Sequence, residues 1–229
     1  DHRDLHSFPT RRSSDLVAVN GIDVEIDQGE FVYVVGPSGA GKSTFIKMMY
    51  REEKPTKGTI IVNGVDLTKL KDRKVPLFRR SLGVVFQDFK LLPKLTVFEN
   101  VAFALEVIEE SPKTIKKKVM EVLDLVHLKH KARMFPSELS GGEQQRVSIA
   151  RSIVNNPRLV IADEPTGNLD PETSKDIMDI FERINASGTT IVMATHNREI
   201  VDTIKHRVIA IENGIIVRDE QRGEYGYEI

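Results

Sequence analysis

Short apolar segments alternate with amphipathic ones along most of the chain. Residues 31–35, 82–86, 159–162 and 189–194 are largely apolar runs, which is typical of buried strands in a parallel sheet. Residues 171–186 instead carry apolar side chains three and four positions apart, which predicts a helix with one buried face. Strands that alternate with helices in this way predict an α/β core with a mostly parallel sheet.

Other segments predict antiparallel pairing or a helical region. Residues 22–26 alternate apolar and polar side chains, as expected of a half-exposed antiparallel strand. Residues 57–64 predict a strand that ends in an Asn-Gly turn, and residues 207–217 predict a hairpin around a second Asn-Gly pair. Residues 91–157 have helical sequence, with one apolar face over residues 115–126. We therefore expect a single domain over residues 16–229 with a helical subdomain inserted at about residues 91–157.

Composition and charge exclude several classes of protein. The chain has 229 residues and a formal net charge of -1, so charge does not favour nucleic acid as the main partner. It contains no cysteine, which excludes disulfides and cysteine-bound metals. No apolar run approaches the roughly 20 residues that a membrane-spanning helix needs. Residues 1–15 are polar and aperiodic and lack the apolar stretch of a signal peptide, so we interpret them as a non-native leader.

A glycine-rich loop joins the strand expected at residues 31–35 to a helix expected from residue 42. It fits the pattern G-x-x-x-x-G-K-[ST], in which backbone N–H groups and the positive end of a helix point at one phosphate. Lys42 would reach the β- and γ-phosphates, and the Ser43 hydroxyl would hold Mg²⁺. A glycine turn that contains Lys-Ser by chance is the alternative, and the flanking strand and helix disfavour it. The ATP-binding residues predicted here are Gly36, Pro37, Ser38, Gly39, Ala40, Gly41, Lys42, Ser43 and Thr44.

Two carboxylates follow the apolar run at residues 159–162. A nucleotide in a P-loop needs a carboxylate near its Mg²⁺, and Asp163 fits that role through a water molecule. Glu164 is then placed to polarise a water in line with the γ-phosphate. A solvated strand end or a helix cap is the structural alternative, which the upstream P-loop disfavours.

A second glycine turn, at residues 139–142, leads into another expected helix. Ser140 predicts an N-cap, and Glu143 would lie in the first turn of that helix. The same geometry makes an anion site, but one chain can hardly bring both glycine loops onto one phosphate. We therefore expect the second loop to close on a nucleotide that another subunit holds.

In their order along the chain, these motifs resemble those of ABC-type ATPases. The resemblance rests on the P-loop, Gln87, residues 139–145, the Asp163-Glu164 pair, residues 167–170 and His196, and it covers residues 16 to about 220. It implies an α/β P-loop fold with a mostly parallel core sheet, an antiparallel β subdomain and the helical insertion. It also implies a homodimer on ATP binding, in which each ATP lies between one P-loop and the other subunit's signature.

The resemblance assigns a role to each motif. Glu164, His196 and Gln87 would be catalytic, and Ser43, Gln87 and Asp163 would surround Mg²⁺. Asp170 would couple the two sites of the dimer. The signature residues, which would grip the γ-phosphate in trans, are Leu139, Ser140, Gly141, Gly142, Glu143 and Gln144.

Residues 50–55, 86–97 and 162–170 resemble the cell-division branch of that family in Gram-positive bacteria. This implies an ATP-hydrolysing subunit on the cytoplasmic face of the plasma membrane, bound to an FtsX-like integral membrane protein and controlling cell-wall hydrolases. The docking surface would lie around residues 87–100, unless the apolar residues there only pack the helical insertion. Two alternatives stay open: the ATPase of a lipoprotein-release or efflux transporter, and a nucleotide-gated scaffold with little turnover, which Glu164 disfavours.

The segment before residue 16 departs from the family's pattern. An aromatic residue that stacks on adenine would fall near Arg12, and the nearby aromatic Phe8 is too far from that place. Stacking of a base on an aromatic ring contributes about 1–3 kcal/mol in nucleic-acid complexes. If residues 1–15 are foreign, we expect weakened ATP affinity with the hydrolytic groups intact.

Overall fold

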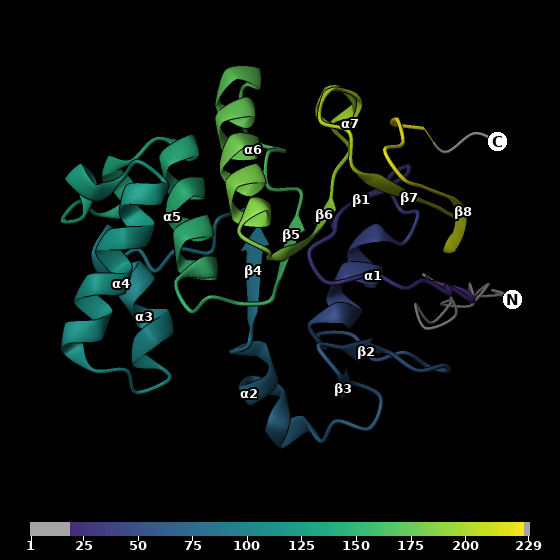
Figure 1. The fold of residues 1–229 in the computed structure, drawn as a ribbon, viewed down its shortest axis with the longest axis horizontal. Helices are drawn as coiled ribbons and strands as arrows, with labels where there is room; N and C mark the ends of the chain where they lie inside the picture. The colour runs from purple at the N-terminus through teal and green to yellow at the C-terminus, as the bar shows by residue number, and fades with distance from the viewer. Residues whose placement is uncertain (1–18, 227–229) are drawn as a thin grey trace, which may run out of the picture.

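A six-stranded sheet forms the centre of the computed structural model, which describes residues 19–226 (Figure 1). The strand order is β4-β5-β6-β1-β7-β8. The strands are β1 (Phe31–Val35), β4 (Leu82–Phe86), β5 (Leu159–Asp163), β6 (Thr190–Ala194), β7 (Arg207–Glu212) and β8 (Ile215–Glu220). Neighbours from β4 to β7 pair parallel, and β8 pairs antiparallel to β7. The carboxyl ends of the parallel strands therefore share one edge of the sheet.

Helices and a small second sheet complete the fold. The α-helices are α1 (Lys42–Met49), α2 (Val75–Arg79), α3 (Val97–Glu106), α4 (Pro112–Leu125), α5 (Gly141–Ile153), α6 (Pro171–Ala186) and α7 (Arg198–Thr203). The 3-10 turns are η1 (Asp72–Lys74), η2 (Lys129–Lys131) and η3 (Pro136–Glu138). The second sheet pairs β2 (Ile61–Val62) antiparallel with β3 (Val65–Asp66). The predicted class, a mostly parallel core sheet with separate antiparallel strands and a helical region, is confirmed.

The two faces of the central sheet bury separate cores, because successive side chains of a strand point to opposite faces. On β1, Phe31 and Tyr33 face the core that the sheet shares with α3 to α6. Val32 and Val34 face the other core, which includes Phe45 and other residues of α1. Covered on both faces, β1 is fully buried, which explains its unbroken apolar sequence.

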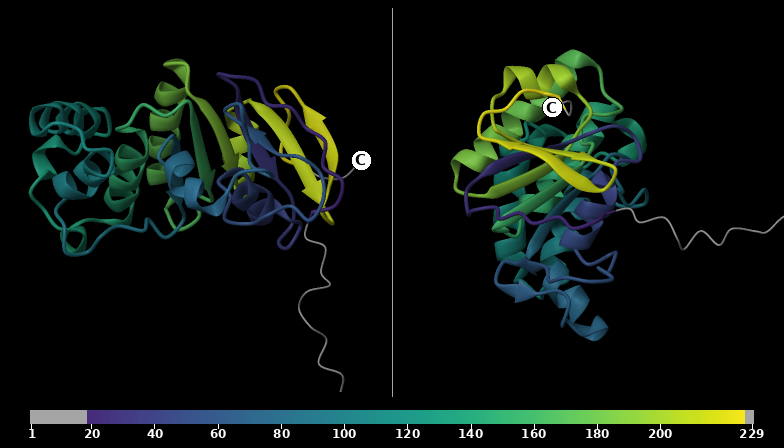
Figure 2. Two further views of the ribbon diagram at one scale, coloured as in Figure 1. Left: turned by 90° about the horizontal axis from the view of Figure 1, so that it is seen from below. Right: turned by 90° about the vertical axis from the view of Figure 1, so that its right-hand side faces the viewer.

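Helices α3, α4 and α5 gather at one end of the molecule, and β7 and β8 lie at the other (Figures 1 and 2). The face predicted for residues 115–126 is buried as expected, with Ile115, Val119 and Leu123 inside. Ser111 caps α4 by accepting a hydrogen bond from the backbone N–H of Thr114. The lysines of α4 lie outside that buried face.

The strand predicted at residues 22–26 is wrong, since the structure forms no strand there. The alternation did identify the inward side, because Ile22, Val24 and Ile26 are half-buried against the α1 core. A strand also needs a partner ladder, which side-chain alternation does not encode. The Glu25 carbonyl instead accepts a hydrogen bond from Arg207 Nη1 at 2.8 Å.

The strand predicted at residues 57–64 is shorter than expected, because only Ile61–Val62 pairs with β3. The Asn-Gly turn is where it was predicted, and Asn63 and Gly64 both have positive φ, 50° and 76°. Beyond the paired residues, the Leu67 N–H donates to the Ile60 carbonyl at 2.8 Å before the chain leads on toward η1. The hairpin of β7 and β8 around Asn213 is confirmed.

The predictions for residues 1–15, including Phe8 and Arg12, fall outside the residues that the structure describes. Within residues 19–226, no helix has the length and apolar character to cross a membrane.

Candidate functional site

The predicted catalytic residues meet at the carboxyl edge of the parallel strands. Gln87 follows β4, Asp163 ends β5, and His196 lies two residues after β6. The P-loop follows β1, which pairs with β6. Ligands of open α/β sheets bind outside the carboxyl ends of the strands. Four segments far apart in the sequence thus converge on one place because their strands are parallel neighbours.

The P-loop presents an uncapped helix end. Gly41 is the N-cap of α1 and has a left-handed backbone, with φ 108°, and no side chain caps the helix. The first turn of α1 contains no acidic residue. The first N–H groups of a helix have no partner within the helix, and they carry the positive end of its dipole. This end of α1 is therefore suited to bind an anion.

Tertiary contacts fix the shape of the P-loop. A Cβ on Gly36, whose φ is 146°, would overlap the backbone carbonyl of Ile211. The Gly214 N–H donates to the Ala40 carbonyl at 2.9 Å, so the turn between β7 and β8 braces the loop. Lys42 Nζ donates to the carbonyls of Gly36 at 2.8 Å and of Pro37 at 3.1 Å. The lysine ammonium is thus held over the loop itself.

The remaining predicted ATP-binding residues lie at the surface of the loop and the start of α1. Ser38, Gly39 and Ser43 are exposed, and Thr44 is half-exposed. They are accessible to a ligand at the end of α1.

Asp163 has a buried oxygen without a partner. Its Oδ1 is buried and accepts no hydrogen bond from any group of the described chain. Burial, and next the charge of Glu164, raise the pKa of the Asp163 carboxyl above its ordinary value. Buried acceptor oxygens rarely lack a hydrogen-bond partner, so Asp163 Oδ1 is suited to bind a cation or a water molecule. Ser43 and Gln87, the other predicted Mg²⁺ ligands, offer a hydroxyl and an amide oxygen, and Mg²⁺ prefers oxygen ligands of this kind.

Glu164 and His196 form a pair. His196 Nδ1 lies 2.8 Å from Glu164 Oε2, and the His196 backbone N–H donates to the same oxygen at 3.1 Å. A carboxylate only accepts, so Nδ1 carries the proton of this bond. The Glu164 side chain is 16% exposed and His196 61% exposed. Glu164 also has a left-handed backbone, with φ 50°, a conformation that non-glycine residues adopt mainly where the surroundings enforce it.

The loop after β4 is tied to two other motifs. Gln87 Nε2 donates to Asn168 Oδ1 at 3.2 Å, and Asn168 Nδ2 donates to the Gln87 carbonyl at 3.3 Å. The next turn contains Phe89 and Lys90, both with positive φ. Arg151, from the C-terminal part of α5, donates to their carbonyls at 3.0 and 2.7 Å. Gln87 is therefore linked to the segment after β5 and, through its loop, to α5.

The second glycine turn begins a capped helix. Ser140 Oγ accepts from the Glu143 N–H at 3.3 Å, and Glu143 Oε2 accepts from the Ser140 N–H at 3.0 Å, which makes a capping box. Glu143 also pairs with Lys131 at 2.5 Å, and that bond lowers the pKa of the Glu143 carboxyl. The N-cap predicted at Ser140 is confirmed.

The neighbours of Ser140 pack against the rest of the chain. A Cβ on Gly142 would overlap the Thr173 methyl group of α6, whereas Gly141 has room for one. Leu139 is buried, and its carbonyl accepts from Gln144 Nε2 at 3.2 Å. The start of α5 is thus fixed against α6 by close contact.

Asp170 caps α6, since its Oδ1 accepts from the Thr173 N–H at 2.9 Å. Hydrogen bonds from Thr173 lower the pKa of the Asp170 carboxyl. The residue predicted to couple two sites of a dimer therefore has a local function in the single chain.

The structure does not bring the signature to the P-loop of the same chain. Helix α5 lies with α3 and α4 at one end of the molecule, and α1 lies beyond β5 and β6 (Figures 1 and 2). Across residues 19–226, no hydrogen bond or ion pair joins residues 36–44 to residues 139–144. Within one chain the two glycine loops serve different places.

Three further residues of the site were not assigned from the sequence. Gln145 is fully buried and donates from Nε2 to the Pro165 carbonyl at 2.6 Å, which ties α5 to the loop after Glu164. Asn168 contacts Gln87, and Lys131 pairs with Glu143. Asn168 and Gln145 both lie in motifs that the sequence analysis noted, at residues 167–170 and 139–145, but no role was assigned to either.

Comparisons with known proteins agree with this architecture. Residues 19–167 match the ABC transporter family. The chain is 76% identical over 209 residues to "Cell division ATP-binding protein FtsE" of Bacillus subtilis (strain 168), covering 91% of this chain and 92% of the relative. It is 66% identical to the protein of the same name from Streptococcus pneumoniae serotype 2, covering 92% of each chain. A solved structure, the "Dimeric structure of a post-hydrolysis state of the ATP-binding cassette MJ0796 bound to ADP and Pi", is similar with TM-score 0.81, 35% identity and coverage of 91% and 92%.

Proposed function

Because the chain belongs to the ABC transporter family and is an ATPase of the FtsE type, we propose that it is the Mg²⁺-dependent ATPase subunit of a cell-division complex. Its partner would be an FtsX-like integral membrane protein, and ATP turnover would control cell-wall hydrolases. The name that the Bacillus subtilis and Streptococcus pneumoniae relatives share supports the division role.

The hydrolytic role is supported most by the Glu164–His196 pair at the strand edge that carries the P-loop. A carboxylate held by a histidine, next to a phosphate-binding loop, is the arrangement needed to orient a water and accept its proton. Glu164 would act as the base. His196 would hold Glu164 in place and keep its exposed ring directed toward the γ-phosphate. The bonds of Glu164 Oε2 to the ring and the backbone N–H of His196 hold the carboxylate in one orientation.

Lys42 and the open N-terminus of α1 would hold the phosphates. Lys42 would exchange its bonds to the loop carbonyls for bonds to phosphate oxygens, since charged hydrogen bonds to phosphate are the stronger ones. Ser43, Gln87 and Asp163, the last through a water, would hold Mg²⁺, which would neutralise phosphate charge. The unpartnered Asp163 Oδ1 is the observation that fits this assignment.

Two copies of the chain would complete each site. The signature residues at the start of α5 lie away from the P-loop of their own chain, so they would contact a nucleotide held by a second copy. The similar MJ0796 cassette, which is dimeric and bound to ADP and Pi, supports this arrangement. Asp170 is the N-cap of α6, and Thr173 in the first turn of α6 packs against the signature residue Gly142. Asp170 would therefore lie where the two copies meet.

The membrane partner would dock on the loop after β4, around residues 87–100. Asn100 is buried, and its side-chain amide holds this loop by hydrogen bonds to the backbone of Leu92, Leu95 and Thr96. The Leu92 side chain in this loop is partly exposed. A fixed backbone that presents an apolar side chain suits a protein interface. The chain would thus be peripheral, at the cytoplasmic face of the membrane, as one domain (16–229) with the helical subdomain of about residues 91–157 next to the partner.

ATP-driven dimerisation of Glu164→Gln tests the proposal. This variant keeps the shape of the site and removes the base, so we expect MgATP to shift it from monomer to dimer on gel filtration while hydrolysis is lost. Asp179→Asn, at an exposed acidic residue of α6 nine positions from Asp170, serves as a control that should hydrolyse ATP normally. A Glu164→Gln chain that binds fluorescent ATP but stays monomeric, or that still hydrolyses ATP, would contradict the proposal.

A further inference from the structure

Glu164 begins a tight turn directly after β5. Its N–H donates to the Ala194 carbonyl of β6 at 2.9 Å, and its own carbonyl accepts from the Gly167 N–H at 3.1 Å. Between these two bonds lies Pro165, which is buried. A proline has no backbone N–H, so its carbonyl is the backbone group through which another segment can hold it by a hydrogen bond. The backbone that follows Glu164 is therefore open to control from outside the turn.

Gln145 reaches this turn from α5. Its Nε2 donates to the Pro165 carbonyl at 2.6 Å, and its side chain is 0% exposed. Within the part of the chain that the structure describes, Gln145 Oε1 has no hydrogen-bond partner, so the bond to Pro165 accounts for the polar contact of this side chain. A buried carbonyl that loses its donor cannot turn to water for another. The bond acts on the backbone one residue after Glu164.

The start of α5 is held in place independently of Gln145. Gly142 packs closely against Thr173 of α6, and Ser140 and Glu143 form the capping box. Lys131 pairs with Glu143 as well. Loss of the Gln145 donor would therefore release the turn after β5 while the first residues of α5 stay where they are.

We propose that Gln145 is a positioning residue for Glu164, because it fixes the backbone that follows the proposed base and thereby the place of its carboxylate. This inference rests on the proposed function, since it needs Glu164 to be the base. Gln145 is buried, so it acts through Pro165 rather than on the nucleotide. The same bond ties the base to α5, the helix whose start would contact a nucleotide held by a second copy.

Gln145→Met tests this role, since it keeps the length of the side chain and removes the donor. A misplacement of about 1 Å can cost about 100-fold in rate, so we expect kcat for ATP hydrolysis to fall about 10- to 100-fold. The affinity for mant-ADP should stay at the parent's value, because the P-loop is unchanged. Slow hydrolysis should also let an ATP-bound dimer accumulate on gel filtration, as expected of Glu164→Gln.

The accumulated dimer separates a positioning role from a merely structural one. A chain whose α5 is damaged would bind nucleotide more weakly and form less dimer, whereas a misplaced base slows turnover and traps the dimer. If Gln145→Met does not fold, Gln145→Leu repeats the test with another apolar side chain that favours helices.

Ser148→Ala is the matched control. Ser148 lies three residues further along α5, is also 0% exposed, and its hydroxyl has no partner within residues 19–226. This variant also removes a buried polar group from the inner face of α5, but no bond to the turn after β5. It should hydrolyse ATP like the parent and should not accumulate as a dimer.

The outcomes of Gln145→Met and Glu164→Gln distinguish the two proposals. Turnover at the parent's rate in Gln145→Met, or a loss of mant-ADP affinity without a trapped dimer, would overturn the positioning role alone. Continued hydrolysis by Glu164→Gln would overturn the assignment of the base in the proposed function, and the positioning role with it.

Discussion

Helices α1 and α5 both begin at a glycine-rich segment, yet the N–H groups of their first turns are satisfied in opposite ways. The N-cap of α1 is Gly41, which has no side chain to accept from the helix N–H groups. The N-cap of α5 is Ser140, which shares a capping box with Glu143. The positive charge at the start of α1 is Lys42, the first residue of that helix. At the start of α5, Lys131 forms an ion pair with Glu143, the acidic residue of the capping box.

The difference shows which of the two turns is ready for an anion in a single chain. The α1 terminus leaves its N–H groups and its dipole for a ligand. At the start of α5, the side chains of Ser140 and Glu143 already accept hydrogen bonds from backbone N–H groups. Only the remaining N–H groups of that turn are available to bind a ligand. This agrees with the proposed arrangement, in which the P-loop of each subunit binds a nucleotide and the signature of the second subunit contacts its phosphate.

Removing the cation from the open terminus should have the largest effect. Lys42→Ala should lower ATP affinity about 100-fold, because a charged hydrogen bond to phosphate is lost in a partly enclosed site. Fluorescent-nucleotide titration measures this change. Ser140→Ala is the comparison at the capped terminus and should leave single-chain affinity unchanged. Equal losses in the two variants would remove the distinction between the termini.

Crowding the capped terminus should affect stability rather than nucleotide affinity. Gly142→Ala would place a Cβ against the Thr173 methyl group, and overpacking of this kind costs about 1–3 kcal/mol. Chemical denaturation measures the loss. Thr173→Ser removes the obstructing methyl group, so the double variant should recover most of the stability. An unchanged unfolding free energy in Gly142→Ala would show that α5 and α6 are not in fixed contact.

Removing the cap itself should have a smaller effect. Ser140→Ala leaves the Glu143 N–H without its acceptor, and loss of an N-cap typically costs about 1 kcal/mol. The free energy of unfolding in urea reports it, with Ser137→Ala, at an exposed serine of η3, as a control outside any N-cap. Stability equal to the parent would mean that the capping box does not hold α5.

The pH dependence of the cap gives the smallest effect. Lys131 and the Ser140 N–H hold the pKa of Glu143 below its ordinary value of 4.5, so its contribution to stability is present above pH 4.5 and is lost as the pH falls through the lowered value. Glu143→Gln should therefore be less stable than the parent, by up to about 1 kcal/mol, near pH 6. The gap should close below the lowered pKa. A gap that stays constant with pH would contradict the ion-pair explanation.

Much of this architecture is predictable from local sequence. The apolar run of β1, the G-x-x-x-x-G-K-S loop and the Ser140 cap depend on neighbouring residues, and the structure places them where they were expected. The 22–26 prediction failed because side-chain alternation encodes the buried face of a segment and not its hydrogen-bonding partner. The buried Gln145 and the Lys131–Glu143 pair could not be foreseen, since each joins segments whose proximity the sequence does not state.

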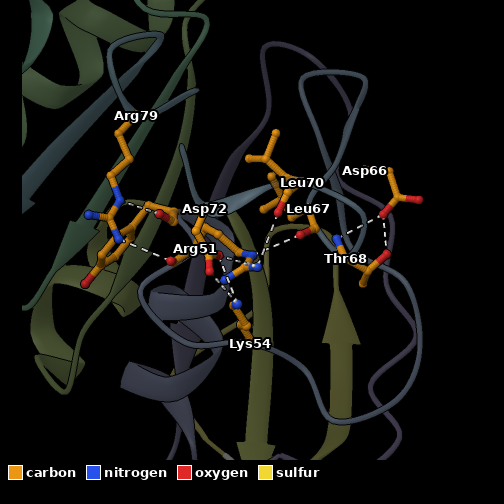
Figure 3. A network of polar contacts seen from close by, with 9 residues as sticks. Arg51, Lys54, Asp66, Leu67, Thr68, Leu70, Asp72 and Arg79 are labelled. Carbon is orange, nitrogen blue, oxygen red and sulfur yellow. Dashed lines mark hydrogen bonds and ion pairs between the residues drawn. The ribbon is translucent and has the colours of Figure 1, made fainter. Parts of the chain in front are cut away.

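By itself, the sequence therefore determined the strand before the P-loop, the starts of α1 and α5, and the chemical groups of the two glycine-rich segments. Backbone propensity, periodicity and capping act over a few residues, so they can be read locally. Only the tertiary structure decided that parallel pairing of β4, β5, β6 and β1 brings Gln87, Asp163, Glu164 and His196 to the P-loop edge. It also decided that Arg51 bonds the Leu67 carbonyl and Arg79 the Tyr50 carbonyl (Figure 3), because long-range hydrogen bonds join residues that are distant in sequence.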